Sequence, residues 1–97
     1  MTLHRRYRVD GRVQGVGFRW FVQQQARALD LAGRVRNAAD GSVIVDVSGT
    51  ADAVAKLEAV MAVGPRGAVV DRVTVLLDGA AASREVGEFP LPFVIDR

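Results

Sequence analysis

Two glycines, a glutamine and an arginine stand within six positions of the segment VQGVGFRW, at residues 13–20. Glycines allow neighbouring backbone N–H groups to point into one concave surface, and a guanidinium can bind two oxygen atoms at once. These residue types at this spacing suit an oxyanion such as phosphate. By composition alone the segment also fits a tight turn followed by a solvated arginine, so both interpretations stay open at this point.

Two common phosphate-binding motifs do not fit this segment. The G-x-x-x-x-G-K-[ST] loop needs a lysine and a hydroxyl that binds Mg²⁺, and neither is present here. The G-x-G-x-x-G fingerprint of dinucleotide-binding proteins would place its third glycine at Trp20, whose indole prevents close approach of a helix to a strand. The segment is therefore neither of these two motifs. No cofactor is expected for this protein.

Few other side chains are candidates for catalysis. The absence of cysteine removes thiolate nucleophiles and sulfur-ligated metals. The one histidine, His4, lies at the start of the first predicted strand, away from the glycine loop, and is interpreted as a surface residue. Asp30 and Asp40 are interpreted as a charge at a helix end and a turn former. Asp46 is predicted to hold an arginine of the first strand, such as Arg8.

Length and composition limit the partners that we expect. A chain of 97 residues, 49% hydrophobic and 25% charged, predicts one globular domain over residues 1–97. No apolar run approaches the ~20 residues that span a bilayer, and no apolar segment follows the basic N-terminus, which predicts the cytoplasm. The net charge is +2 and the arginines are dispersed. We therefore expect neither nucleic acid nor a membrane as a partner. The protein is expected to be a monomer.

The pattern of apolar residues predicts the secondary structure. Alternation over residues 5–13 is typical of a half-buried strand, and helical spacing from Phe18 predicts a helix that Gly33 ends. Two strands are predicted around the turn AADG, and a second helix begins after Thr50. The two strands around the turn are predicted at 34–38 and 42–48. A further strand is predicted at 69–77, followed by a loop at 79–88 and a short edge strand within 89–95.

The resulting order, β-α-β-β-α-β, predicts an α+β protein with a ferredoxin-like split βαβ sandwich. We expect an antiparallel sheet of four strands, plus a possible short fifth edge strand, with two helices on one face. Strands one and three lie in the centre of such a sheet. Asn37, at the end of strand two, is then expected at the same edge as the glycine loop, about 10 Å from strand one.

The segments GRVQGVGFRWF at 11–21 and GRVRNAADGSV at 33–43 resemble the two signature segments of the acylphosphatase family, and VGPRGAVVDRV at 63–73 resembles the passage after that family's second helix. The resemblance implies hydrolysis of an acyl phosphate to a carboxylate and inorganic phosphate, without a metal. It also implies two catalytic residues, Arg19, which binds phosphate oxygens, and Asn37, which orients the water. The residues whose main-chain N–H groups are implied to bind phosphate are Gln14, Gly15, Val16, Gly17 and Phe18.

Two residues leave questions open. The family usually has an aromatic residue at the position of Arg34, and we expect the arginine to point to solvent. The C-terminal FVIDR only approximates the family's ending. Trp20 falls on the polar side of the first predicted helix, where it either covers the rim of the site or is simply exposed.

Three alternatives remain beside a small acylphosphatase. RNA-binding modules share the β-α-β-β-α-β order, but they stack bases on aromatic residues of strand three, where this chain has SVIVDVS. A regulatory module that binds a small ligand is a second alternative. The N-terminal domain of hydrogenase-maturation carbamoyltransferases is a third, although 97 residues are not expected to contain the rest of such an enzyme.

Overall fold

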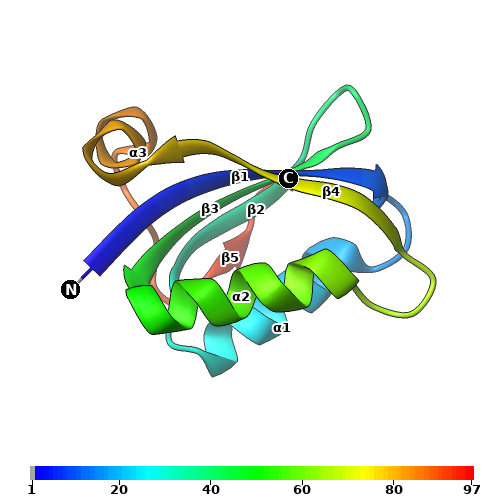
Figure 1. Ribbon diagram of the computed structural model, residues 1–97, viewed down its shortest axis with the longest axis horizontal. Coiled ribbons are helices and arrows are strands. Elements are labelled where there is room, and N and C mark those ends of the chain that lie inside the picture. The colour runs from blue at the N-terminus through cyan, green and yellow to red at the C-terminus, as the bar shows by residue number, and fades with distance from the viewer. Residues whose placement is uncertain (1) are drawn as a thin grey trace.

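The computed structural model describes residues 2–97, and its strands form one sheet in the order β4-β1-β3-β2-β5 (Figure 1). The central strands are β1 and β3, as predicted. The elements in chain order are β1 (Thr2–Arg12), α1 (Phe18–Ala28), β2 (Ala32–Asn37), β3 (Val43–Thr50), α2 (Ala51–Val63), β4 (Val69–Asp78), α3 (Gly79–Val86) and β5 (Val94–Ile95).

The first four strands pair antiparallel, which confirms the predicted ferredoxin-like sandwich. β1 pairs with β3 and β4, and β2 pairs with β3. The short fifth strand, β5, pairs in parallel with β2, so the complete sheet is mixed. Pro90 and Pro92 precede β5 and have no N–H to donate, which limits that strand to the residues after them.

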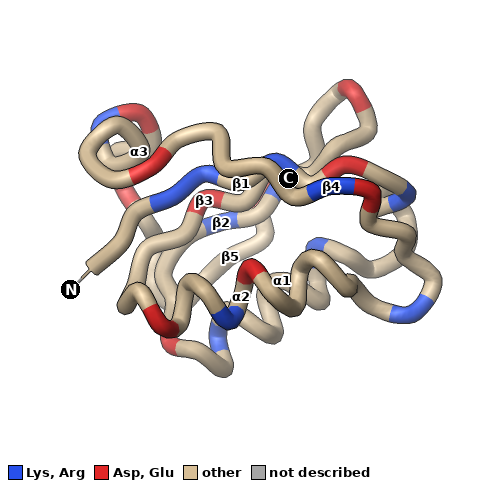
Figure 2. Tube along the Cα trace, in the orientation of Figure 1, with Lys and Arg blue, Asp and Glu red and all other residues tan. Residues whose placement is uncertain are grey.

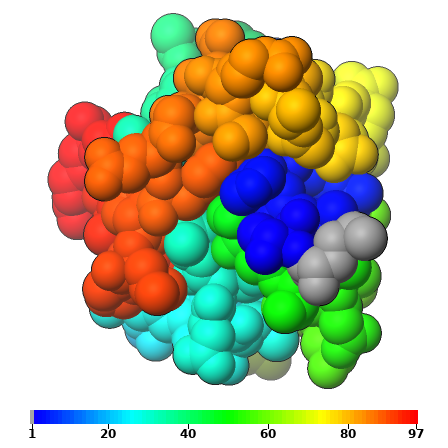
Figure 3. All heavy atoms as spheres, turned by 90° about the vertical axis from the view of Figure 1, so that its left-hand side faces the viewer, coloured from blue at the N-terminus to red at the C-terminus, as the bar shows by residue number. Residues whose placement is uncertain are grey.

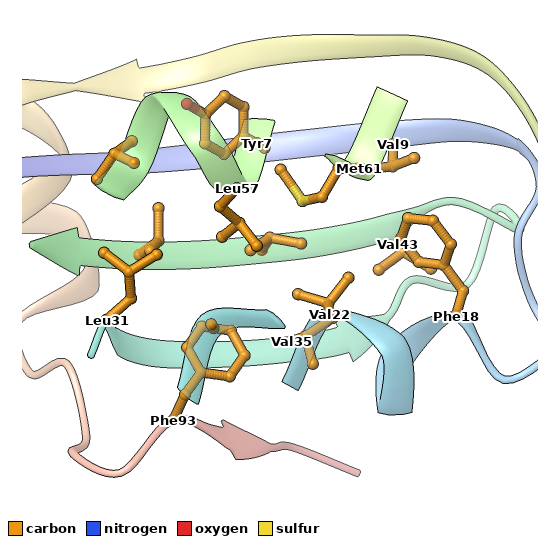
Figure 4. Close-up of a cluster of buried hydrophobic side chains, with 14 of the residues drawn as sticks. Tyr7, Val9, Phe18, Val22, Leu31, Val35, Val43, Leu57, Met61 and Phe93 are labelled. Carbon is orange, nitrogen blue, oxygen red and sulfur yellow. The ribbon is translucent and has the colours of Figure 1, made fainter. Parts of the chain in front are cut away.

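Helices α1 and α2 cover one face of the sheet and enclose the core (Figure 1). Successive side chains of a strand point to opposite faces, so alternate residues of β1 and β3 face the helices. Figure 4 shows these side chains meeting residues of α1 and α2 and Phe93 of the C-terminal segment. The largest fully buried side chains are Tyr7, Phe18, Phe93, Leu31, Leu57 and Met61.

The segment predicted as a loop at 79–88 instead forms α3, and that prediction was wrong. Helix α3 lies on the opposite side of the sheet from α1 and α2, beside the N-terminal half of β1 (Figures 1 and 3). Ala82 is the buried residue of this helix and is fully enclosed. The alanines favour a helix, whereas the flanking Gly79 and Gly87 suggested a loop.

The prediction that Gly33 ends the first helix was also wrong. Helix α1 ends at Ala28, and Asp30 takes a left-handed conformation at φ 56°. Gly33 lies within β2, where an added Cβ would meet the carbonyl oxygen of Asp46. The glycine is therefore required by the close approach of β2 and β3.

Asp46 pairs with an arginine of β1, as predicted, but that arginine is Arg6 rather than the Arg8 given as an example. Arg6 is its direct partner in the β1–β3 register, and Arg6 Nε lies 2.6 Å from Asp46 Oδ1. Arg8 lies two residues further along β1, opposite Ile44, and binds Asp10 at 2.9 Å. The sequence showed which face these residues share but not their register.

Two other side chains are more enclosed than predicted. Arg34 was expected to point to solvent, yet it is half-buried and donates from Nη2 to the carbonyl oxygen of Glu88 at 2.8 Å. His4 is half-buried, and its ring lies 5.2 Å from that of Phe89.

Basic and acidic residues are spread over several elements (Figure 2). Within residues 2–97, no helix has the length and apolar character needed to cross a membrane.

Candidate functional site

The loop between β1 and α1 has a backbone conformation that only glycine adopts easily. Gly15 has φ 75°, and Gly17 has φ 78° and immediately precedes α1. A Cβ added at either position would meet nothing within 4 Å, so the backbone angle rather than lack of space favours glycine. Left-handed residues among right-handed ones make consecutive N–H groups converge, which creates a concave binding surface for anions.

The N-terminus of α1 leaves its amides without a side-chain partner. Gly17 provides no side-chain cap, and the first turn contains no acidic residue. The first amide with an acceptor at this end is that of Phe21, which donates to the Gly17 carbonyl oxygen at 3.0 Å. The amides before it point out of the helix, where the helix dipole favours negative charge. Arg19 lies in this turn and adds a full positive charge.

A hollow of about 210 Å³ opens at this loop and brings most of the predicted phosphate-binding residues together. Gly15, Gly17, Phe18 and Arg19 contribute to its lining, and their binding of phosphate stays a prediction. The residues that line it are Val13, Gly15, Gly17, Phe18, Arg19, Trp20, Ile95 and Arg97. Val16 instead packs against the hydrophobic core.

Sequence reasoning missed the contribution of the C-terminal segment to this hollow. Ile95 and Arg97 reach it because β5 pairs in parallel with β2 beside α1. That pairing has no local signal in the sequence. Val13 and Trp20 also line the hollow, and both are close in sequence to the predicted loop. The rim of the site was one of the two places that the sequence left open for Trp20.

A second hollow, of about 380 Å³, lies between α2 and β4 but is a poorer site for an oxyanion. Its lining includes the carboxylates of Glu58 and Asp71 beside Arg72. Two carboxylates repel an anion, and the adjoining α2 has its N-terminal amides capped by Thr50. The smaller hollow at the start of α1 is therefore the candidate site.

The side chain of Gln14 connects the glycine loop to the turn between β2 and β3. Its Nε2 donates to the carbonyl oxygen of Ala38 at 2.8 Å and to that of Ser42 at 2.9 Å. Both amide hydrogens are therefore used within the protein. Phosphate binding by the main-chain N–H of Gln14 stays a prediction, whereas the bracing role of its side chain was not foreseen.

Asn37 is the last residue of β2, and it is exposed. It pairs in register with Val43, the first residue of β3. Ala38 follows Asn37 in the chain, and the hydrogen bond from Gln14 to Ala38 ties the glycine loop to it. Asn37 is not among the residues that line the hollow. It lies at the same edge of the sheet as the glycine loop, where the sequence predicted it.

The turn that follows Asn37 is fixed by its own hydrogen bonds. Asp40 Oδ1 accepts from the Ser42 hydroxyl at 2.6 Å and from the Ser42 main-chain N–H at 3.0 Å. These bonds, with Arg8 Nη1 2.8 Å from Asp40 Oδ2, lower the pKa of Asp40 to about 2. Asn37 is thus followed by a turn that is held by its own hydrogen bonds and is tied to the glycine loop.

The geometry can bind an oxyanion and orient a water molecule beside it. Converging amides and one guanidinium stabilise negative charge, and a primary amide both donates and accepts hydrogen bonds. A leaving group that departs easily needs no general acid, so such a reaction requires no catalytic group beyond these.

Comparison with known proteins gives consistent matches. The family model described as acylphosphatase matches residues 5–88. A protein of Koribacter versatilis named acylphosphatase is 55% identical over 71 residues, which are 73% of this chain and 64% of that protein. One of Salinibacter ruber with the same name is 47% identical over 78 residues, which are 80% of this chain and 82% of that protein.

Solved structures show the same similarity. The crystal structure of acylphosphatase from Bacillus subtilis superposes with a TM-score of 0.85 at 33% identity, and covers 100% of both chains. Full-length HypF, described as phosphate- and nucleotide-bound, matches with a TM-score of 0.79 at 26% identity. That match covers all of this chain but 12% of HypF.

Proposed function

Because this chain belongs to the acylphosphatase family, we propose that it hydrolyses acyl phosphates to a carboxylate and inorganic phosphate where α1 begins. One observation of the structure supports this site above all. The N-terminus of α1 has neither a cap nor an acidic residue, and it adjoins a loop with two left-handed glycines and Arg19. This is an arrangement suited to binding and stabilising a phosphoryl group.

In the proposed complex, the main-chain N–H groups of residues 14–18 bind the phosphate oxygens, and the Arg19 guanidinium binds two of them. Phosphoryl transfer spreads negative charge over the equatorial oxygens as the bond to the leaving group breaks. Donors that are already in place stabilise this charge without reorganising. The reaction is proposed to need no metal or cofactor, since these groups supply the charge.

Asn37 is proposed to hold the attacking water. The water oxygen forms a bond to phosphorus, and the bond from phosphorus to the acyl oxygen breaks with its electron pair leaving on the carboxylate. A carboxylate is a weak base, so its departure needs no general acid. The proton of the water passes to an oxygen of the phosphate itself. Orientation of this water is the contribution that Asn37 makes to the rate.

We also propose that residues 1–97 form a single domain and that the protein acts as a monomer in the cytoplasm. The continuous sheet and the single core support one domain. Light scattering on the purified protein should give the mass of one chain, and twice that mass would contradict the proposal.

The activity is tested with benzoyl phosphate and acetyl phosphate in the presence of EDTA. The protein should hydrolyse both, and Asn37→Ala should lower kcat by about 10²-fold because the water is no longer oriented. Gln24→Ala removes an exposed amide elsewhere on α1 and should leave kcat unchanged. Circular dichroism confirms that each variant is folded. A folded protein that hydrolyses neither substrate, or an unchanged kcat in Asn37→Ala, would contradict the proposal.

A further inference from the structure

Trp20 is exposed in a way that packing does not explain. Its side chain is 62% exposed, although tryptophan is the largest apolar residue of the chain. The buried face of α1 consists of Phe18, Val22 and Ala26, and Trp20 is not part of it. Trp20 therefore contributes little to the core, and most of the surface that its indole exposes is apolar.

The exposed indole forms part of the same hollow as the proposed phosphate site. Gly15, Gly17 and Arg19 line one part of it, and Trp20 and Ile95 add apolar surface. An acyl phosphate bound through its phosphate group at the loop has its acyl group next to that loop. The volume of about 210 Å³ corresponds to roughly seven water molecules, and it has to hold the phosphate as well as the acyl group.

We propose that Trp20 binds the acyl group of the substrate, and that the enzyme therefore prefers acyl phosphates with an aromatic or bulky apolar acyl group to acetyl phosphate. This inference rests on the proposed function, which places the phosphate at the loop. An indole face stacks on an aromatic ring and packs against an aliphatic chain, whereas a single methyl group covers little of it. Trp20 is then a residue that determines specificity, while Arg19 and the loop bind what all substrates share.

The inference is tested by the ratio of kcat/KM for benzoyl phosphate to that for acetyl phosphate. Trp20→Ala should lower kcat/KM for benzoyl phosphate by about three- to tenfold and change that for acetyl phosphate by less than about twofold. Trp20→Phe keeps an aromatic face and should retain most of the ratio. Leu76→Ala, which truncates an exposed apolar residue of β4, should leave the ratio unchanged.

Two failures of this experiment are distinguishable. Hydrolysis of both substrates with an unchanged ratio in Trp20→Ala, or with equal losses for both, would overturn the role of Trp20 and leave the proposed function intact. Hydrolysis of neither substrate by the folded wild-type protein would overturn the proposed function, and with it this inference.

A second measurement does not depend on turnover. Trp20 is the chain's one tryptophan, so its fluorescence reports on this position alone. Phenacylphosphonate, in which a methylene group replaces the bridging oxygen of benzoyl phosphate, should change the emission as it saturates the protein. Inorganic phosphate at saturation should change it much less. Emission that does not respond to phenacylphosphonate, while the same compound inhibits hydrolysis competitively, would overturn the inference.

Discussion

The two long helices on the core face begin in opposite ways. Helix α2 follows Thr50, whose hydroxyl accepts a hydrogen bond from the Ala53 amide at 3.2 Å, and Asp52 lies in its first turn. Helix α1 follows Gly17, has no cap, and carries Arg19 in its first turn. One helix has a side-chain cap for an N-terminal amide and an acidic residue in its first turn, whereas the other has neither. The difference indicates which helix start is built for stability and which for binding.

Removal of one cation from each helix should give the largest contrast in activity. Arg19→Ala should lower kcat/KM for benzoyl phosphate by about 10²- to 10³-fold, because a contact to the developing charge is lost. Lys56→Ala on α2 removes an exposed lysine that pairs with Asp52 at 3.4 Å, and should leave kcat/KM within about twofold. Both variants should remain folded by circular dichroism. Similar losses in the two variants would remove the distinction between the helices.

Gln14→Leu should have the next largest effect, because it cuts the tie between the glycine loop and the turn after Asn37. We expect kcat to fall by about 10- to 100-fold as Asn37 loses its position. The inhibition constant of phosphate should change less than kcat, since the main-chain donors remain. Two carbonyl groups lose a partner, so unfolding in urea should become easier by about 1–2 kcal/mol.

Gln24→Leu on the exposed face of α1 is the matched control for this substitution, with no change expected in kcat. If phosphate binding in Gln14→Leu weakens as much as kcat falls, Gln14 supports the loop itself rather than Asn37.

Thr50→Ala tests the capped helix and should affect stability alone. Loss of the hydroxyl at this N-cap should lower the free energy of unfolding by about 1 kcal/mol. The corresponding change in Tm is about 4–8 °C for a domain of this size. Thermal unfolding measures it, and kcat for benzoyl phosphate should stay unchanged at 25 °C. A large loss of activity in the folded variant would show that the start of α2 also serves the reaction.

The smallest expected effect concerns the turn beside Asn37 and depends on pH. The pKa of Asp40 is about 2 in the native protein, chiefly through its hydrogen bonds to Ser42, and its ordinary value is 3.8. A depressed pKa adds stability that is present above the ordinary value and is lost as the pH falls toward 2. The wild type should therefore be more stable than Asp40→Asn at pH 5, and this difference should shrink toward pH 2 in urea unfolding. A difference that does not vary with pH would show that Asp40 contributes through packing alone.

The parts of the fold that local pattern determines were predictable. Alternation in β1 and β3, the apolar stripe of α1 and the cap at Thr50 all depend on neighbours in the sequence. Helix α3 was predicted wrongly, and the arginine of β1 that pairs with Asp46 is Arg6 rather than Arg8. The first was hidden by its flanking glycines, and the second depends on the register between β1 and β3, which alternation does not fix.

The residues of the candidate site also fall into those that local sequence predicted and those that it did not. Gly15, Gly17 and Arg19 could be placed because they are adjacent in sequence and precede a recognisable helix, and the strand order placed Asn37 at the same edge. The bracing contacts of Gln14 were not predictable, since they reach residues 24 and 28 positions further along the chain. The contribution of Ile95 to the hollow required the parallel pairing of β5.

The central claim is that the start of α1 binds an oxyanion and the start of α2 does not. Titration of the ¹⁵N-labelled protein with inorganic phosphate, followed by amide chemical shifts, compares the two directly. We predict saturable shifts at the amides of residues 15–19 and none of comparable size at residues 51–53. Saturable shifts of equal size at both helices, or no shifts at residues 15–19 at high phosphate, would contradict the account.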